Sequence, residues 1–251
     1  MNVQLVDTMP QSNLDAAIVQ AARVSYAGGS AKPARTDEGL IRYLMRHHHT
    51  TPFEMVEFKF YIKMPIFLAR QHFRHRTASI NEISARYTEV KNEYFIPDQY
   101  RSQSTINKQC SDGPINIDSS RQVASCKEAF STYHELLENG CARELARCHL
   151  PQSTYTEFYW KINLHNLMHY LHLRMAPDAQ QEIREYANAI FKCIEPLLPF
   201  TMKAFMDFRI NAITLSGPEV ESIRVGNPIE NASEQRELCE KLKRLGLVVK
   251  D

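Results

Sequence analysis

The stretch that decides the fold lies at residues 55–74 and reads MVEFKFYIKMPIFLARQHFR. Its first ten residues alternate between apolar and polar side chains, which is the period of a β-strand with one buried face. Such alternation is typical of an antiparallel sheet, because parallel strands are usually covered on both faces. One face would carry Val56, Phe58, Phe60, Ile62 and Met64, and the other Glu57, Lys59, Tyr61 and Lys63.

Pro65 ends this strand and suits the first turn of a helix that begins at Ile66. The helix would place Gln71 and Arg74 about one turn apart. Side chains at this spacing lie on one face of a helix, so both can reach the same pocket.

The remaining segments are mostly helical, with one further strand. The aromatic stretch YTEFYWKINL (155–164) is strand-like, and Thr36 and Asn163 are helix N-cap candidates. This mixture predicts an α+β fold in which helices flank an antiparallel sheet. Residues 91–117 are polar and aperiodic, which predicts a long loop. Helices are expected at residues 12–25, 120–139, 163–174, 178–195 and 200–209, and a further helix after Thr36 would put Leu40, Ile41, Leu44 and Met45 on one stripe.

Composition narrows the class of protein. The chain has 251 residues, of which 43% are hydrophobic and 24% charged, as in an ordinary globular protein. It contains no apolar run of the roughly 20 residues that a membrane helix needs, and its start lacks the pattern of a signal peptide. The six cysteines form no CxxC pair. We therefore expect a cytoplasmic protein with reduced thiols and no membrane partner.

Charge is concentrated locally. The net charge is +1, which argues against a nucleic-acid partner. Between residues 70 and 87, however, six basic side chains face a single acid, Glu82. A small cationic site of this kind suits a compact anion better than a long polyanion. The basic residues are Arg70, His72, Arg74, His75, Arg76 and Arg86.

Common catalytic signatures are missing. The chain has neither GxGxxG nor GxxxxGK[ST], the two usual phosphate-binding loops, and no GxSxG nucleophile elbow. The cationic segment RHRTASINEISARY (74–87) is the most distinctive stretch. So many polar groups are costly to hold against a core unless a ligand or a neighbouring chain satisfies them.

This segment contains the motif RHR(x7)S, from Arg74 to Ser84, and it resembles the flavin-dependent thymidylate synthase family. The similarity extends over roughly residues 21–207. It includes the blocks HTTPFE (49–54), MPIFLARQ (64–71), ARELAR (142–147), NLHNLMHYLHLR (163–174) and AQQEIREYA (179–187).

The resemblance implies an activity. Family members move the methylene of methylenetetrahydrofolate to dUMP, and FAD reduced by NADPH supplies the hydride that completes dTMP. The resemblance also implies a homotetramer whose active sites are shared between subunits. We accordingly expect a catalytic FAD- and dUMP-binding domain at residues 1–215 and a polar, weakly amphipathic tail at 216–251.

The resemblance also assigns residues. For dUMP these are Gln71, Arg74, Glu82, Ser84, Ala85, Arg86, Arg147 and Arg174. For FAD they are Ser25, Thr51, Glu54, Arg74, His75, Arg76, Asn81, Glu82, Asn163, His165 and His169. His49 and Tyr87 are assigned to folate, and the catalytic set is Arg174, Ser84 and His49.

These residue types suit that chemistry. Guanidinium groups bind phosphate with two parallel charged hydrogen bonds. Arg174 against the pyrimidine would stabilise enolate-like charge and so activate carbon 5 of uracil. Ser84 is interpreted as a binding hydroxyl rather than a nucleophile, because no general base is paired with it at catalytic spacing. The absence of a Pro-Cys motif separates the chain from cysteine-dependent thymidylate synthases.

Three positions depart from some relatives, which carry Arg, Asn and His at His165, His169 and Asp178. The two histidines can still donate hydrogen bonds, whereas an ionised Asp178 cannot. We therefore expect the affinity for FAD at that edge to differ from that of those relatives.

Two other functions stay open at this point. His165, His169 and His172 share one helix face, as in a metal-dependent phosphohydrolase, although no HExxH or HD pair is present and no metal is expected. The arginine cluster and the aromatic strand would also suit an RNA-binding module, which the near-neutral charge disfavours.

Overall fold

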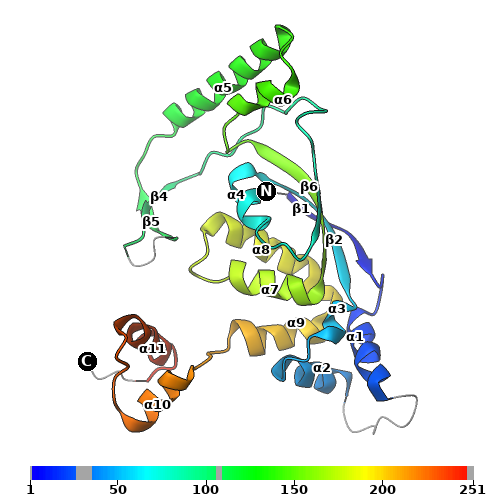
Figure 1. Ribbon diagram of the computed structural model, residues 1–251, viewed down its shortest axis with the longest axis vertical. Helices are drawn as coiled ribbons and strands as arrows, with labels where there is room; N and C mark the ends of the chain where they lie inside the picture. Colours follow the sequence, from blue (N-terminus) through cyan, green and yellow to red (C-terminus); the bar gives the residue numbers. More distant parts are fainter. Residues whose placement is uncertain (1, 27–35, 106–108, 248–251) are drawn as a thin grey trace. The chain divides into compact units, whose positions relative to one another are not determined.

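The computed structural model describes residues 2–26, 36–105 and 109–247. The chain divides into two compact units, Met1–Phe205 and Met206–Asp251. The first contains an antiparallel four-stranded sheet in the order β1-β2-β6-β3 (Figure 1). Its strands are β1 (Asn2–Met9), β2 (Glu57–Pro65), β3 (Ser79–Glu82) and β6 (Tyr155–Asn163).

The two central strands pair over their full length and supply the core. In the β2–β6 register Phe60 lies opposite Trp160, and Ile62 lies opposite Phe158. All four side chains are buried. The alternation predicted for residues 55–64 is confirmed, since Val56, Phe58, Phe60, Ile62 and Met64 are all at most 1% exposed.

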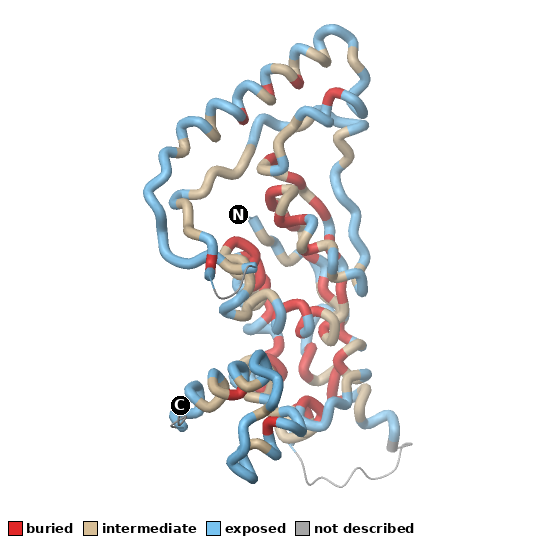
Figure 2. The backbone as a smooth tube through the Cα atoms, turned by 60° about the vertical axis from the view of Figure 1, so that its left-hand side comes forward, coloured by how far each residue is buried: buried red, intermediate tan, exposed pale blue. Residues whose placement is uncertain are grey.

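Helices cover the apolar face of this sheet. Figure 2 shows buried backbone concentrated in the sheet and in the helices that pack on it. Beside the sheet lie α4 (Ile66–His72), α7 (Leu164–Arg174) and α8 (Gln181–Ile194). Near its end lie α1 (Leu14–Arg23), α2 (Asp37–Arg46), α3 (Thr51–Glu54) and α9 (Pro199–Phe205). The predicted α+β class, with helices flanking an antiparallel sheet, is confirmed.

Both predicted N-caps are present. Thr36 Oγ1 accepts a hydrogen bond from the Gly39 amide at 3.1 Å. Asn163 Oδ1 accepts one from the Asn166 amide at 2.9 Å. Each bond satisfies an amide that the first turn of a helix would leave without a partner.

A smaller core lies around α5 (Ser120–Glu138) and α6 (Arg143–Ala146). It is built on Phe130, Tyr133 and Ala146. The Val90 amide donates to the Tyr133 hydroxyl at 3.0 Å, which ties the segment after β3 to these helices. A 3-10 turn, Arg147–His149, follows α6.

The structure corrects two expectations from the sequence and adds one strand that the sequence did not indicate. Residues 91–117 are not wholly a loop, because β4 (Tyr100–Gln103) and β5 (Ser111–Ile115) pair as an antiparallel hairpin. Its residues are mostly exposed, so no apolar alternation marks it. Arg74 does not lie on the helix with Gln71, since α4 ends at His72. The edge strand β1 is not predicted from the sequence, because a bulge between Leu5 and Asp7 breaks its period.

The second unit begins with a π-helical turn, Met206–Ile210, and contains α10 (Gly217–Val225) and α11 (Ala232–Arg244). Ser216 and Glu219 form a capping box at the start of α10. Lys241 Nζ lies 2.7 Å from the buried Glu219 carboxylate and joins the two helices.

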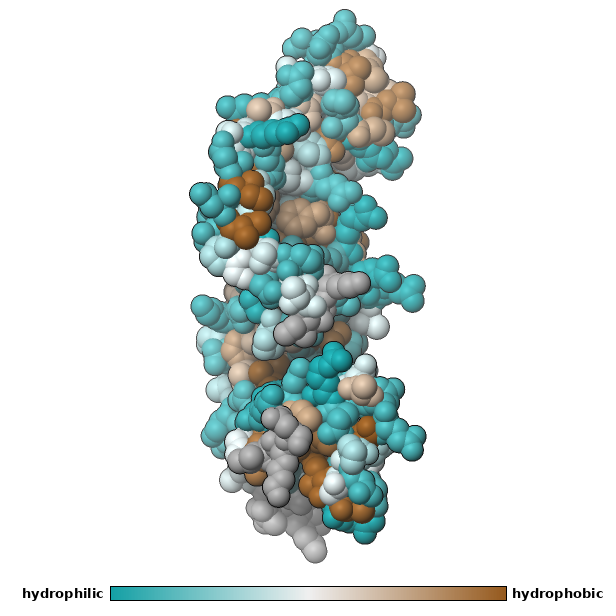
Figure 3. All heavy atoms as spheres, turned by 90° about the vertical axis from the view of Figure 1, so that its left-hand side faces the viewer, coloured by the Kyte–Doolittle hydropathy of each residue, from teal (hydrophilic) through white to brown (hydrophobic). Residues whose placement is uncertain are grey.

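The surface carries both hydrophilic and hydrophobic side chains. Hydrophilic side chains predominate on the face drawn in Figure 3, and hydrophobic ones form separate patches. Across the described residues, the helices are too short or too polar to span a bilayer.

A buried carboxylate links α1 to α9. Asp15 accepts from the backbone amides of Phe200 (2.9 Å) and Thr201 (3.1 Å) and from the Thr201 hydroxyl (2.5 Å). An anion at a helix N-terminus satisfies unpaired amides and the helix dipole together.

We predict that Asp15→Ala lowers the free energy of unfolding by about 2–4 kcal/mol. The substitution leaves the Phe200 and Thr201 amides and the Thr201 hydroxyl without their charged acceptor. Urea denaturation followed by circular dichroism measures this. Asp7→Ala is the control, since that carboxylate is exposed and accepts from the neighbouring Thr8 amide. Equal losses in the two variants would contradict the anchoring role.

Candidate active site

The distinctive motif folds as an edge strand. Ser79 to Glu82 pair with β6, with Ile80 opposite Trp160 and Glu82 opposite Phe158. The four residues of β3 are exposed, so the core strand β6 holds them in place without burying them. The Ile83 amide then donates to the Glu157 carbonyl at 2.9 Å, which extends the pairing by one residue.

Ser84 begins a turn directly after β3 and accepts its hydrogen bonds. The Ser84 carbonyl accepts from the amides of Tyr87 (3.0 Å) and Thr88 (3.1 Å), and its hydroxyl accepts from the Arg86 amide at 3.3 Å. In the described part of the chain no histidine or carboxylate bonds the Ser84 hydroxyl. Arg86 lies over the Tyr87 ring at 5.4 Å, and both side chains are exposed.

A cavity of about 280 Å³ opens beside this turn. Predicted dUMP residues Glu82, Ala85 and Arg147 line it, together with Thr154 and Thr156 of the β6 region. The buried Thr156 hydroxyl donates to Glu82 Oε1 at 2.5 Å and so orients the carboxylate. The Thr154 hydroxyl is buried and has no hydrogen-bond partner among the described residues.

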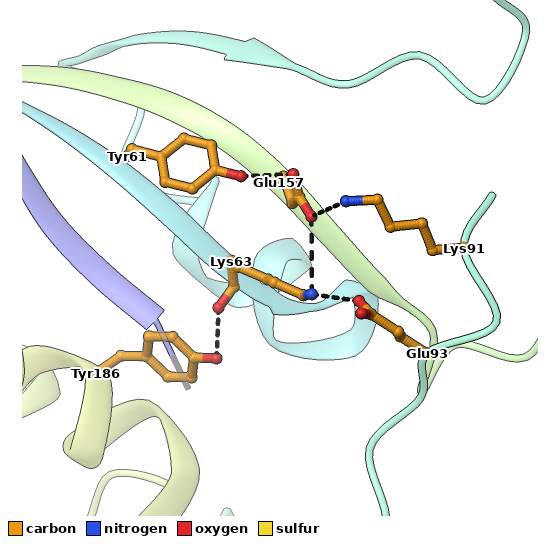
Figure 4. A network of polar contacts seen from close by, with 6 residues as sticks. All are labelled: Tyr61, Lys63, Lys91, Glu93, Glu157 and Tyr186. Carbon is orange, nitrogen blue, oxygen red and sulfur yellow. Dashed lines mark hydrogen bonds and ion pairs between the residues drawn. The ribbon is translucent and has the colours of Figure 1, made fainter. Parts of the chain in front are cut away.

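A polar network adjoins this cavity, and its members Lys91, Glu93 and Glu157 line it (Figure 4). Glu157 accepts from Tyr61 Oη at 2.5 Å and from Lys91 Nζ at 3.3 Å. Lys63 pairs with Glu93 and lies 3.7 Å from Glu157, while Tyr186 donates to the Lys63 carbonyl at 2.7 Å.

The hydrogen bonds of the network favour an ionised Glu157, a neutral Tyr61 and a charged Lys63. The hydrogen bond from Tyr61 lowers the pKa of Glu157, and the same bond, with burial, raises the pKa of Tyr61 to about 12. The hydrogen bond to Glu93 raises the pKa of Lys63. Lys91, the lysine that lines the cavity, is matched by Glu157, which leaves Arg147 as the cation that the lining offers to an anionic ligand.

A second group lies where α4 and α7 end. Arg174 Nε donates to His75 Nε2 at 3.0 Å, and His75 packs edge-on against Tyr170 with ring centroids 4.9 Å apart. His169 lies 6.1 Å from the His75 ring. The buried His72 Nδ1 is 3.1 Å from the Tyr170 hydroxyl. The contact with His75 uses only the Nε donor of Arg174, so its two terminal amino groups can serve a ligand.

His72 and His75 of this group are neutral at physiological pH. Burial, aided by nearby His75 and Arg174, lowers the pKa of His72 to about 3. Burial and the Arg174 charge lower the pKa of His75 to about 4. A neutral His75 that accepts from Arg174 at Nε2 carries its proton at Nδ1.

A third group borders a cavity of about 810 Å³ near α2 and α3. Its walls are mostly apolar, with Ala22, Val24, Leu40, Pro52 and Met55 among them. Three predicted residues supply polar groups: Ser25, His49 and Thr51. His49 packs edge-on against Tyr43, with ring centroids 5.7 Å apart.

The remaining predicted residues are distributed around these groups. Arg74, Arg76 and Asn81 are exposed between α4 and the end of β3, and Tyr87 is 75% exposed. Glu54 ends α3, Asn163 caps α7, and His165 is half-buried in its first turn. Gln71 donates through Nε2 to Gln180 Oε1 at 2.5 Å. Gln71 and Arg174 do not line the cavity of Glu82 and Arg147.

Sequence reasoning missed the residues that support these side chains. Thr156, Glu157 and Tyr170 contact predicted site residues or line their cavity, yet the sequence marks them only as parts of a strand or a helix. A threonine at an inward-facing position of an otherwise apolar strand is the available signal.

The histidine face that suggested a metal does not gather a ligand set. Within residues 2–26, 36–105 and 109–247, no group of three or more His, Cys, Asp or Glu side chains is placed to hold a metal ion.

The geometry describes an α+β protein with paired cationic and polar groups set around an edge strand, suited to a small anionic ligand. Comparison with known proteins identifies the family. Residues 4–200 match the family model described as thymidylate synthase complementing protein. The chain is 48% identical over 249 residues to the flavin-dependent thymidylate synthase of Dictyostelium discoideum, and the match covers 95% of this chain and 82% of that protein.

Other relatives agree. The flavin-dependent thymidylate synthase of Thermus thermophilus is 51% identical over 226 residues, covering 88% of this chain and 82% of the relative. The crystal structure of the UMP/dUMP methylase PolB from Streptomyces cacaoi with 5-Br UMP superposes with a TM-score of 0.71 at 38% identity, covering 83% and 95% of the two chains. The chain belongs to the flavin-dependent thymidylate synthase family.

The lowered histidine pKa values predict acid sensitivity. On unfolding, these histidines take up protons between their ordinary pKa of about 6.5 and their folded pKa values, about 3 for His72 and about 4 for His75. Stability should therefore be full above about pH 6.5 and fall on acidification, by up to about 1.4 kcal/mol per pH unit for each such group.

His72→Phe should make this slope shallower while costing about 1–3 kcal/mol at neutral pH, since the Tyr170 hydroxyl loses its partner. Denaturant titrations at several pH values measure both effects. His149→Gln, at an exposed position, should keep the wild-type slope. An unchanged slope in His72→Phe would show that His72 does not titrate as described.

Proposed function

We propose that this chain converts dUMP to dTMP, with methylenetetrahydrofolate as the methylene donor and FAD reduced by NADPH as the hydride source. The observation that carries the proposal is the family match over residues 4–200, which includes the edge strand and turn that carry Glu82 and Ser84. The related structures of the Streptomyces methylase with 5-Br UMP and 5-Br dUMP support a pyrimidine nucleotide as the substrate class.

The dUMP site would combine two of the groups described above. Glu82, Ser84, Ala85, Arg86 and Arg147 surround or adjoin the cavity beside β3. Gln71, Arg74 and Arg174 would come from the group at the ends of α4 and α7. Arginine forks suit a phosphate here, because Lys91, the lysine that lines the cavity, is already paired with Glu157.

Arg174 would act on the base. Its guanidinium is held through Nε by a neutral His75, so its terminal amino groups can face a uracil oxygen. A fixed positive charge there stabilises the enolate-like charge that develops when carbon 5 attacks the methylene group. Ser84 would bind the nucleotide, since its hydroxyl accepts from a backbone amide and no base among the described residues activates it.

The residues present fit a flavin. A flavin ring is flat and largely apolar with a polar edge, and the cavity that includes Ser25 and Thr51 has apolar walls with a few polar groups. Bound FAD supplies the hydride. Neutral His75 offers an Nδ1 proton as a donor. Further contacts would come from Glu54, Arg74, Arg76, Asn81, Glu82, Asn163, His165 and His169, with His49 and Tyr87 for the folate.

We infer a cytoplasmic homotetramer with shared sites. Gln71 and Arg174 do not line the cavity of Glu82 and Arg147, and this supports sharing, because one substrate must contact both groups. A tetramer should appear in multi-angle light scattering at micromolar concentration, and a fully active monomer would overturn the proposal.

The decisive test is visible absorbance under anaerobic conditions. The purified protein should show a flavin spectrum that bleaches with NADPH, and it should form dTMP when dUMP and methylenetetrahydrofolate are added. A protein that binds no added FAD and forms no dTMP would refute the proposed function.

For Arg174 we predict that Arg174→Ala lowers the rate of dTMP formation by far more than tenfold while FAD stays bound, since a tenfold loss corresponds to only about 1.4 kcal/mol. Single-turnover assays and the flavin absorbance of the variant measure the two properties. Arg184→Ala is the control, because Arg184 is an arginine of α8 whose Nη1 donates to the Pro177 carbonyl at 2.7 Å. Turnover of Arg174→Ala within tenfold of the wild type would exclude the role.

A further inference from the structure

A chain of directed hydrogen bonds runs from the β4–β5 hairpin to Gln71. Arg101 of β4 pairs with Glu182 near the start of α8. Gln180 Nε2 donates to Glu182 Oε2 at 2.8 Å, and Gln180 Oε1 accepts from Gln71 Nε2 at 2.5 Å. The Glu182 residue is 8% exposed, so solvent contributes little to its satisfaction.

The Glu182 carboxylate sets the donor-to-acceptor direction of this series of hydrogen bonds. An ionised carboxylate only accepts hydrogen bonds, whereas a glutamine amide can turn over and exchange donor for acceptor. Glu182 therefore requires the amino group of Gln180 to face it, which turns the Gln180 oxygen toward Gln71. The amino group of Gln71 must then face Gln180. Gln71 is left with its amide oxygen and one amide hydrogen for a ligand.

The ionisation of Glu182 is secured locally. Burial on its own raises the pKa of this carboxyl, but the hydrogen bonds from Arg101 and Gln180 outweigh burial and lower it. Arg101 also donates through Nε to the Ser111 hydroxyl of β5 at 2.8 Å, which fixes it within the hairpin. The Cys110 thiol donates to the Asp178 carbonyl at 2.7 Å, a second link between the hairpin and the segment before α8.

We infer that Glu182 is a positioning residue of the nucleotide site, and that Arg101, Glu182 and Gln180 together orient the Gln71 amide. The inference rests on the proposed function, since it takes Gln71 as a dUMP contact. The β4–β5 hairpin then has a role in the site, because its Arg101 pairs with the buried Glu182 carboxylate that sets the orientation of the Gln71 amide.

The inference makes a sharp prediction for Glu182→Gln. Arg101 would now face the oxygen of the new amide, whose amino group would face Gln180. Gln180 would turn over, and Gln71 would follow, presenting its amino group to the ligand instead of its oxygen. A misdirected polar group in a binding site costs affinity rather than chemistry. The KM for dUMP should rise about tenfold, with kcat within about twofold and the FAD content unchanged.

The double variant Gln180→Glu with Glu182→Gln provides the rescue. The carboxylate introduced at position 180 would accept from Gln71 and from the amide at position 182, whose oxygen would face Arg101. This arrangement restores the original direction at Gln71. The KM for dUMP should then return to within about threefold of the wild type. A contribution limited to packing predicts no such recovery, because both variants disturb the same contacts. A contribution of net charge is tested by the Glu185→Gln control below, which removes one negative charge from the same helix.

Two controls separate the alternatives. Glu185→Gln alters an exposed carboxylate on the same helix that accepts from Gln181 at 3.1 Å, and it should leave KM unchanged. Arg101→Lys keeps a donor to Glu182 but loses the Ser111 bond, so KM should stay within about twofold. An Arg101→Lys effect as large as that of Glu182→Gln would assign the role to the hairpin and overturn the orientation mechanism.

All variants are measured beside the wild type in one dTMP-forming assay with circular dichroism as a folding check. A wild type that forms no dTMP refutes the proposed function itself. An active wild type with an unchanged KM in Glu182→Gln refutes only the positioning role. If Glu182→Gln does not fold, the double variant decides: a KM near the wild type supports the inference, and a KM raised about tenfold overturns it.

Discussion

The pairing of β2 with β6 is the interaction on which the rest of the structure depends. Nine consecutive residue pairs, from Glu57–Asn163 to Pro65–Tyr155, align the apolar faces of both strands. A slip of one residue would turn each face over and expose Phe60 or Trp160. Because β3 pairs with β6, the same register also sets the position of the motif residues Asn81 and Glu82. The site is therefore built on a strand that the core already holds.

The lysines and the arginines of the site differ in how their charge is neutralised. On the outer face of the sheet Lys63 and Lys91 are matched by Glu93 and Glu157, and a tyrosine hydrogen bond keeps Glu157 ionised. In contrast, Arg174 is oriented by a neutral histidine, which takes one donor and cancels none of the charge. This arrangement concentrates usable positive charge in groups that bind planar or phosphate oxygens with defined geometry.

How much of the fold and site is predictable depends on whether a feature shows in local sequence. The alternation of residues 55–64 and the caps Thr36 and Asn163 are local, and the structure bears them out. The β3 strand is four exposed residues, so only its partner β6 could reveal it. The hairpin and α10 escape prediction for a related reason, since both bury few apolar side chains. Contacts such as Thr156 with Glu82 join residues 74 positions apart and need the fold itself.

The polar chain from Arg101 to Gln71 illustrates a more general constraint. Two glutamines in contact have two self-consistent orientations of nearly equal energy, and a binding site that used them alone would be mixed. An acceptor-only group at one end removes that degeneracy, but only if it stays ionised while mostly buried. The guanidinium of Arg101 meets this requirement from the hairpin. An element that adds little to the core can thus matter through the single charge that it delivers to a buried position.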